Sequence, residues 1–309
     1  MSRQRSHAAG LTMVEVLVAL AISMLLLVLM LRVFSDMRSA TAVQQLLAGA
    51  QGEAGVALNL MVRDMRSAGG WGCRPRRVMI SGIDENDPWL RYSRPVEGWP
   101  GSAMPPVLSP ATLTPLPDST VIAVRGRAGE SMPVLTADED IVIAETRREQ
   151  TGCSGEARFN GLCPGDPVAI THCGGGRISL IDSITPFSQD GADYLRLTLD
   201  PPPELVDPHT RLIPVRTRVY FMAQRRDGSI GLFRRDNAGR SQEVADGNHR
   251  LHATFAATLQ ETDDFIPAAE ITDWSSITAT RLTLEWGDEV ADGGISPLTT
   301  TIAIRNRLP

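Results

Sequence analysis

Four cysteines are the residues of this chain that most readily form covalent bonds or bind a metal. They are Cys73, Cys153, Cys163 and Cys173. An even set favours disulfides in an oxidising compartment. Zinc is the alternative, but the gaps between the last three cysteines lack the C-x₂₋₄-C spacing of a zinc knuckle. Four cysteines allow three pairings, which all stay open; we favour Cys153–Cys163, which closes a short loop, together with Cys73–Cys173.

The histidines, glycine runs and acidic stretches show no catalytic pattern. The histidines are His7, His172, His209, His249 and His252, and none lies in an H-E-x-x-H motif. The sequence at 228–231 lacks the G-x-S-x-G spacing of a nucleophile elbow. The acidic stretches at 137–140 and 261–264 do not match a calcium-binding EF-hand loop. We therefore expect no enzymatic activity, no cofactor and no metal.

The most unusual chemical group is the carboxylate of Glu15, because it lies inside an apolar run. Between residues 11 and 31 only Thr12, Glu15 and Ser23 are polar. A run of this length forms a helix of roughly 31 Å, about the thickness of the hydrocarbon core of a bilayer. A carboxylate at that depth costs about 2.5–3.5 kcal/mol and is rarely present without a partner. The pattern predicts a membrane helix with a functional charge.

The segment before the apolar run indicates how the helix is oriented and processed. Residues 1–10 contain Arg3 and Arg5, no acid, and end at Gly10. Basic flanks stay in the cytoplasm, so the rest of the chain is expected outside. An ordinary secretory signal is one alternative, but its candidate cleavage site at 40–42 lies well past an apolar run that is too long for it. A plain single-span anchor explains neither Gly10 nor Glu15.

The sequence GLTMVEVLVALAIS, residues 10–23, resembles the class III signal of type IV pilins and type II secretion pseudopilins. The usual form is G-F-T-L-x-E before an apolar helix. Gly10 and Thr12 match, Glu15 matches the glutamate at the fifth mature position, and Leu11 replaces the commoner phenylalanine. The resemblance implies cleavage by a prepilin peptidase between Gly10 and Leu11, and N-methylation of Leu11. Glu15 would then pair with the new amine, in its own chain or a neighbour's, and fix the register of assembly.

One long N-terminal helix must position these residues. No proline occurs before Pro75, and apolar residues continue at helical spacing beyond the membrane segment. We predict a transmembrane or filament-core half over 11–31 and an amphipathic half over 32–68. The pair at 69–70, Gly-Gly, provides a stop that tolerates left-handed backbone. Gly49, Gly52 and Gly55 interrupt the helix, and close packing and local melting both stay open as their role.

The end of this helix carries a second resemblance. VRDMRSAGGWGC, residues 62–73, resembles the R-D-L-R-x-A-G-Y-x-G-C segment that closes the N-terminal helix of PilW-type minor pilins. Gly70 stands where the usual aromatic residue would be, with Trp71 one place later, so the local turn is expected to differ. The segments 165–173, 231–255 and 273–286 also resemble this family. The resemblance touches most of the chain except roughly 75–118.

The remainder of the chain predicts a β-rich head. We expect a Gly/Pro-rich connection over 69–118, since residues 75–118 are proline-rich and show little periodicity, and no strand layer there. Between 119 and 309, short runs alternate apolar and polar residues, as half-exposed antiparallel strands do. The expected fold is α+β and type IV pilin-like, with one long N-terminal helix packed on an antiparallel, sheet-rich globular head. A Cys73–Cys173 disulfide would tie the helix end to that sheet.

The composition limits the function classes. A hydrophobic fraction of 42% suits a globular body, and a net charge of −6 argues against a nucleic-acid surface. The resemblance implies a minor pilin that primes assembly of a type IV pilus and sits at its tip. Implied partners are other minor pilins, the major pilin, the inner-membrane assembly platform, prepilin peptidase and a tip adhesin. The alternatives are a J-type minor pseudopilin of type II secretion and a single-span anchored periplasmic domain.

Localisation follows from the same resemblance. It implies a single-pass inner-membrane protein with a periplasmic head, later incorporated into an extracellular pilus. Twitching motility, cell adhesion and DNA uptake all stay open as the task of that pilus.

Overall fold

The computed structural model describes residues 13–71, 78–79, 83–137, 140–153, 156–173, 175–203, 209–247, 249–257, 265–286 and 297–304. The chain divides into two compact units, Met1–Gly52 and Glu53–Pro309, which are described separately. The leader and three predicted site residues, Gly10, Leu11 and Cys73, lie outside the described residues.

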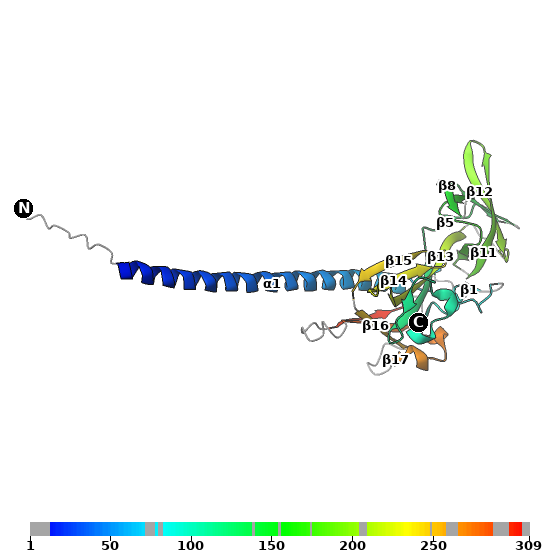
Figure 1. Ribbon diagram of the computed structural model, residues 1–309. Coiled ribbons are helices and arrows are strands. Elements are labelled where there is room, and N and C mark those ends of the chain that lie inside the picture. Colours follow the sequence, from blue (N-terminus) through cyan, green and yellow to red (C-terminus); the bar gives the residue numbers. More distant parts are fainter. Residues whose placement is uncertain are drawn as a thin grey trace, which may run out of the picture. The chain divides into compact units, whose positions relative to one another are not determined.

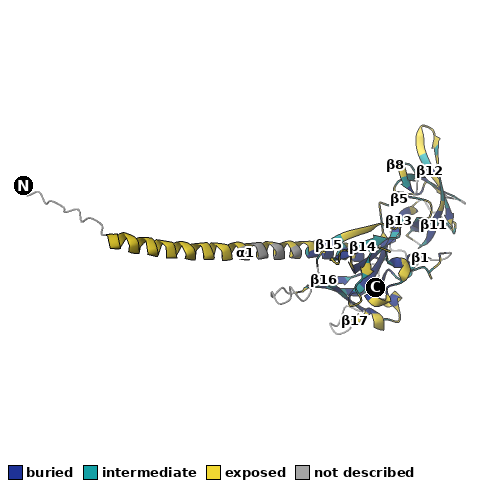
Figure 2. Ribbon diagram, viewed as in Figure 1, coloured by how far each residue is buried: buried dark blue, intermediate teal, exposed yellow. Residues whose placement is uncertain are grey.

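The first unit contains the N-terminal part of helix α1 (Met13–Arg66), which carries the predicted membrane segment. The stretch Met13–Arg38 has a mean hydropathy of 2.8, and none of the side chains in its most apolar window is buried. Figure 2 shows this stretch as exposed along its whole length. A helix this long and apolar is able to cross a bilayer.

The last turns of α1 belong to the second unit and bury one face. Ala54, Ala57, Leu58, Met61 and Met65 are each at most 7% exposed. Their spacing places them on one side of the helix, where they join a core formed with strand side chains. The helix ends at Arg66, and Gly69 then has a φ of 66°, the left-handed backbone expected of a terminating glycine.

A 13-stranded sheet forms most of the second unit (Figure 1). Its strands are β1 (Val78–Met79), β2 (Val96–Pro100), β3 (Thr114–Pro115), β4 (Thr120–Arg127), β5 (Met132–Pro133), β6 (Thr136–Ala137), β7 (Asp140–Ala144), β10 (Pro167–His172), β11 (Gly175–Gln189), β12 (Ala192–Asp200), β13 (Arg211–Gln224), β14 (Ile230–Asp236) and β15 (Ser241–Asp246). The main path runs β15-β14-β13-β10-β11-β12-β7-β6, and β13 also pairs with β3, β4 and β5. The pairs are antiparallel, apart from the parallel pair β1–β11.

Two smaller sheets and four short helices complete the described part of the unit. The four-stranded antiparallel sheet has the order β17-β16-β18-β19, with bounds Ile266–Pro267, His249–Ala256, Ala279–Trp286 and Leu298–Ala303. β8 (Arg148–Cys153) and β9 (Glu156–Phe159) form a separate antiparallel pair. The 3₁₀ helices are η1 (Gly101–Ala103), η2 (Pro106–Leu108), η3 (Ala268–Glu270) and η4 (Trp274–Ser276). One N-terminal apolar helix and a sheet-rich head make an α+β architecture, consistent with a pilin-like fold.

Strand β13 separates two hydrophobic cores because its side chains alternate between the faces of the sheet. Tyr220 and Met222 lie in the core that contains the buried face of α1. Val219 and Phe221 lie in the core that contains Leu108 of η2. The end of α1 therefore packs against one face of β13, and the other face of β13 contributes to the second core.

The stretch predicted to be a connection without strands contains a strand of the large sheet. β2 pairs with β4 from Val96↔Val124 to Pro100↔Thr120, and Val96 and Glu97 are each 1% exposed. The prediction that 75–118 forms no strand layer was wrong here. The proline-rich sequence showed no strand pattern here. Among the described strands β2 pairs only with β4, so it lies at an edge of the described sheet, where Pro100 is tolerated at the strand end.

Candidate functional site

The predicted assembly charge, Glu15, lies in the first turn of α1. Its neighbours Met13 and Val14 are 81% and 69% exposed, so the carboxylate sits on a helix surface that is otherwise apolar. Gly10 and Leu11 lie outside the described residues. Cleavage between them, methylation of Leu11 and pairing of its amine with Glu15 therefore stay predictions.

The segment that closes α1 contains a second carboxylate, Asp64, which is only 3% exposed. The hydroxyl of Tyr220 on β13 donates a hydrogen bond to Asp64 Oδ2 at 2.6 Å. Arg218 Nε and Arg234 Nη1 lie 3.5 Å and 4.0 Å from the same oxygen. Burial, followed by the charge of Asp64, raises the pKa of Tyr220 well above its usual range, so the hydroxyl remains a donor. Two neighbouring strands thus hold the helix end through one buried acid.

The residues after Asp64 attach to strand β4. The Gly69 N–H donates to the carbonyl of Arg125 at 3.0 Å, and Ala68 forms an isolated β-bridge with Gly126. A Cβ atom at Gly126 would lie 2.9 Å from the carbonyl oxygen of Ser67, so a side chain there would push the helix end away. The close approach of the two backbones explains why this strand position is a glycine.

A buried ion pair lies immediately beside this contact. Arg125 Nη2 is 2.8 Å from Glu97 Oε2, and both side chains are almost completely buried. Arg125 also donates to the carbonyls of Arg94 and Pro88, each at 2.7 Å. Burial lowers the pKa of Arg125, while Glu97 opposes that shift. Both Nη atoms of Arg125 have acceptors, whereas its buried Nε has none among the described residues; the pair belongs to the scaffold around the helix end.

Sequence reasoning singled out the segment 62–73 but missed what Asp64 and Glu97 do. Their partners lie far along the chain: Tyr220 is 156 residues from Asp64, and Arg125 is 28 residues from Glu97. The only local signal of this role was that Asp64 lies among apolar residues of the helix.

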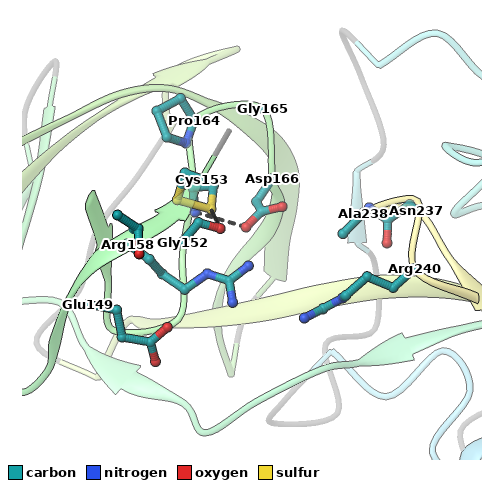
Figure 3. Close-up of a pocket in the computed structure, with 12 residues that line it drawn as sticks. Glu149, Gly152, Cys153, Arg158, Pro164, Gly165, Asp166, Asn237, Ala238 and Arg240 are labelled. Carbon is teal, nitrogen blue, oxygen red and sulfur yellow. Dashed lines mark hydrogen bonds between the residues drawn. A yellow bond between two sulfur atoms is a disulfide. The ribbon is translucent and has the colours of Figure 1, made fainter. Parts of the chain in front are cut away.

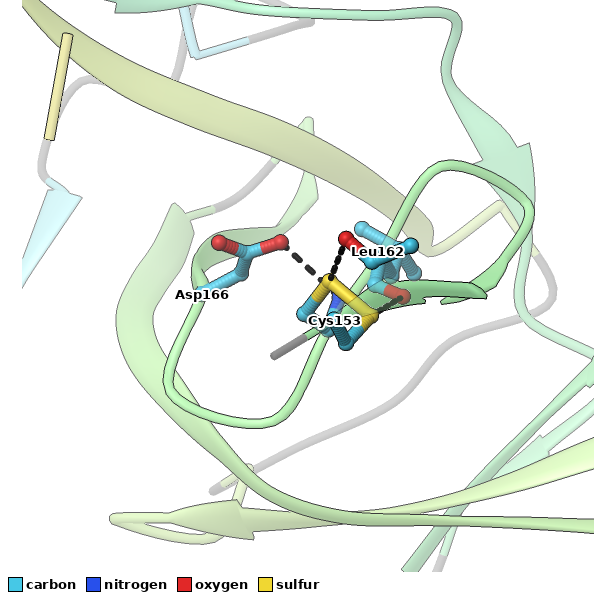
Figure 4. The surroundings of a disulfide bond; sticks show 5 residues. Cys153, Leu162 and Asp166 are labelled. Atoms are coloured by element: carbon cyan, nitrogen blue, oxygen red, sulfur yellow. Dashed lines mark hydrogen bonds between the residues drawn. A yellow bond between two sulfur atoms is a disulfide. The ribbon is translucent and has the colours of Figure 1, made fainter. Parts of the chain in front are cut away.

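The structure contains a disulfide between Cys153 and Cys163, with a Cα–Cα distance of 5.5 Å. The Cys163 N–H donates to Asp166 Oδ2 at 2.9 Å, which fixes the turn that follows the disulfide (Figure 4). Cys173 is also disulfide-bonded. Its predicted partner, Cys73, lies outside the described residues. The described part of the chain contains no cluster of three or more His, Cys, Asp or Glu residues that could hold a metal ion.

Comparison with known proteins bears on the N-terminal segment. The family model of the prokaryotic N-terminal methylation motif matches residues 5–31, which include Gly10, Leu11 and Glu15. This motif indicates a prepilin-like protein of the type IV pilin or pseudopilin kind. The motif and the apolar helix together fit a membrane-anchored, single-pass protein. Neither the curated proteins nor the solved structures gave a match to the chain.

Proposed function

We propose that this prepilin-like protein is a PilW-type minor pilin, which primes assembly of a type IV pilus and sits at its tip. The observation that carries the proposal is that the methylation motif contains an exposed apolar helical segment with one carboxylate, Glu15. The segment 62–73, which resembles the helix end of PilW-type pilins, supports this branch of the pilins. In the structure that segment docks the helix onto the sheet.

The proposed mechanism begins with cleavage after Gly10, which leaves a positively charged amine on Leu11. Glu15 lies four positions after the residue that carries this amine, a rise of about 6 Å along a helix. Opposite charges in a low-dielectric environment attract strongly, whereas one buried charge without a partner is expensive. A subunit that docks so that Glu15 meets an amine is therefore favoured over other axial positions.

We propose a structural, non-enzymatic role, in which the protein is the substrate of prepilin peptidase. The apolar helix would hold it in the inner membrane with its head in the periplasm. It would then join the other minor pilins and the major pilin through the inner-membrane assembly platform and reach the extracellular tip. A tip adhesin is a further proposed partner.

Two measurements test this function. Mass spectrometry of the mature protein should find an N-terminus at a methylated Leu11. Glu15→Ala should still insert and be processed but should not enter pili, because the amine loses its partner. Asp36→Ala, in the same helix beyond the apolar core, should enter pili normally.

Other results would contradict the proposal. An intact Met1, or cleavage near Ala42, would indicate an anchored periplasmic domain. Normal incorporation of the Glu15→Ala protein would refute the role of the charge. Cross-linking to secretion pseudopilins instead of pilins would indicate the J-type pseudopilin.

A further inference from the structure

A cavity of about 740 Å³ lies between the disulfide loop and the turn that joins β14 to β15. One side carries Glu149, Arg158, Asp166 and the Cys153–Cys163 bridge, and the other carries Asn237 and Arg240 (Figure 3). The volume falls within the range of small-molecule sites. Its lining is polar and charged, so it suits a polar ligand rather than an apolar one.

The cavity adjoins the same face of β13 that the end of α1 packs against. Residues 216, 218 and 220 of β13 share one face of the sheet because side chains alternate along a strand. Tyr220 lies under α1 and Arg218 contacts Asp64 at the helix end. Arg216 lies one step further along the face, where its Nη1 is 3.6 Å from Asp236 Oδ2, next to the turn that borders the cavity. The helix covers one part of this face, and the cavity adjoins the next.

Four charged residues line the cavity, and two of them, Arg158 and Asp166, make no ion pair within 4.0 Å among the described residues. Arg240 Nε and Nη2 lie 3.2 Å and 3.1 Å from Asp236 Oδ2. Glu149 is paired with Arg147 at 2.7 Å. Arg158 makes no ion pair within 4.0 Å in the part of the chain that the structure describes, although its guanidinium points into the cavity (Figure 3).

The hairpin β8–β9 is shaped to place Arg158. A Cβ atom at Gly152, on the opposite strand, would lie 2.4 Å from Arg158 Cβ and 3.2 Å from Arg158 Cδ. Any side chain at position 152 would therefore displace the arginine. The adjacent disulfide holds Gly152 in place by joining Cys153 to Cys163.

Two buried polar atoms at the cavity have unmet hydrogen-bonding capacity. Arg158 Nε and Asn237 Oδ1 are buried, and neither has a hydrogen-bond partner among the described residues. The first requires an acceptor and the second requires a donor. A carboxylate satisfies a guanidinium with two parallel hydrogen bonds, but it cannot donate to an amide oxygen. A ligand that carries both an anionic acceptor and a hydroxyl group would satisfy both atoms.

We propose that this cavity binds a small hydroxylated carboxylic acid of the sugar-acid class, with Arg158 holding the carboxylate and Asn237 accepting from a hydroxyl. The carboxylate of Asp166 lines the same cavity and repels negative charge, so a monoanion fits better than a doubly charged phosphate ester. The inference does not depend on the proposed role in pilus assembly.

Calorimetric titration of the full chain in detergent micelles tests the site with D-glucuronate, D-glucose and glucose 6-phosphate. Glucuronate should bind, glucose should not, and the phosphate ester should bind more weakly than glucuronate. Arg158→Gln should weaken glucuronate binding at least tenfold, and Gly152→Ala should do the same by displacing Arg158. Arg127→Gln is the matched control, because Arg127 pairs with Val215 and so lies on the opposite face of the sheet.

Several outcomes would overturn the proposal. These are no binding of glucuronate to the wild-type chain, unchanged binding in both Arg158→Gln and Gly152→Ala, or tighter binding of glucose 6-phosphate than of glucuronate. Tryptophan fluorescence checks that each variant is folded. If Arg158→Gln fails to fold, Arg158→Lys keeps the charge without the planar fork and should still lose at least several-fold in affinity.

Discussion

Replacing Tyr220 with phenylalanine removes one hydroxyl group from the junction between α1 and the sheet. That hydroxyl donates to Asp64 Oδ2 at 2.6 Å, and Tyr220 is 0% exposed. A hydrogen bond to a charged group contributes about 1.5–3 kcal/mol to stability. Arg218 remains near the carboxylate after the substitution, so the loss should stay in this range. Asp64→Ala should cost more, about 3–5 kcal/mol, because it also leaves the partly buried guanidinium groups of Arg218 and Arg234 without this counter-charge.

The chain offers a clean signal for this measurement. Its tryptophans are Trp71, Trp89, Trp99, Trp274 and Trp286, so all of them lie in the second unit. Urea unfolding of the full chain in detergent, followed by tryptophan fluorescence, therefore reports on the head alone. In thermal unfolding followed by the same fluorescence, a head of this size loses about 2–4 °C in Tm for each kcal/mol of stability. Tyr220→Phe should therefore lower Tm by roughly 3–12 °C.

The control is Tyr194→Phe, which removes a hydroxyl from a half-buried tyrosine stacked on Phe187 in the hairpin β11–β12. It should change stability by less than about 0.5 kcal/mol. The double variant Asp64→Ala/Tyr220→Phe should lose less than the sum of the two single losses, because both remove the same bond. Equal effects of Tyr220→Phe and Tyr194→Phe, or strictly additive losses in the double variant, would refute the proposed junction.

Two other substitutions test the disulfide loop. Burial raises the pKa of Asp166 above its unfolded value, so ionisation of this carboxyl opposes folding once the pH rises above about 4. Asp166→Asn should therefore be more stable than wild type at pH 7, and the gain should vanish at pH 3; a gain independent of pH in urea unfolding would contradict this. Replacing both Cys153 and Cys163 with serine opens a loop of sequence separation 10 and should cost about 2–3 kcal/mol. An unchanged urea midpoint in that double variant would show that the loop is held by other contacts.

The features that sequence reasoning described correctly are local ones. An apolar run without proline predicts a long helix, and Gly69 takes the left-handed backbone that its position after the helix suggests. Alternation of apolar and polar residues indicates strands such as β12, where Leu195, Leu197 and Leu199 are buried and Arg196 is exposed. These features can be predicted from sequence because each depends on residues within a few positions of one another.

The features that sequence reasoning missed depend on distant partners or on unusual composition. The prolines around β2 obscured its strand pattern in the sequence. In the structure β2 pairs with β4, and Glu97 is buried beside Arg125. The sequence also does not distinguish Arg158, which makes no ion pair among the described residues, from the other arginines of the chain. That distinction arises because Gly152 lies across the hairpin from it and no described acid lies within ion-pair distance.

The sequence by itself determined that this chain contains a methylation motif, an apolar segment over 11–31 with one carboxylate, Glu15, and a β-rich head. Periodicity and hydropathy are properties of neighbouring residues, so they can be read without a fold. Only the tertiary structure decided that Asp64 is held by Tyr220, and that Arg158, Asn237 and Arg240 border one cavity. Such contacts depend on strand register and on which side chains water can reach, and chain folding sets both.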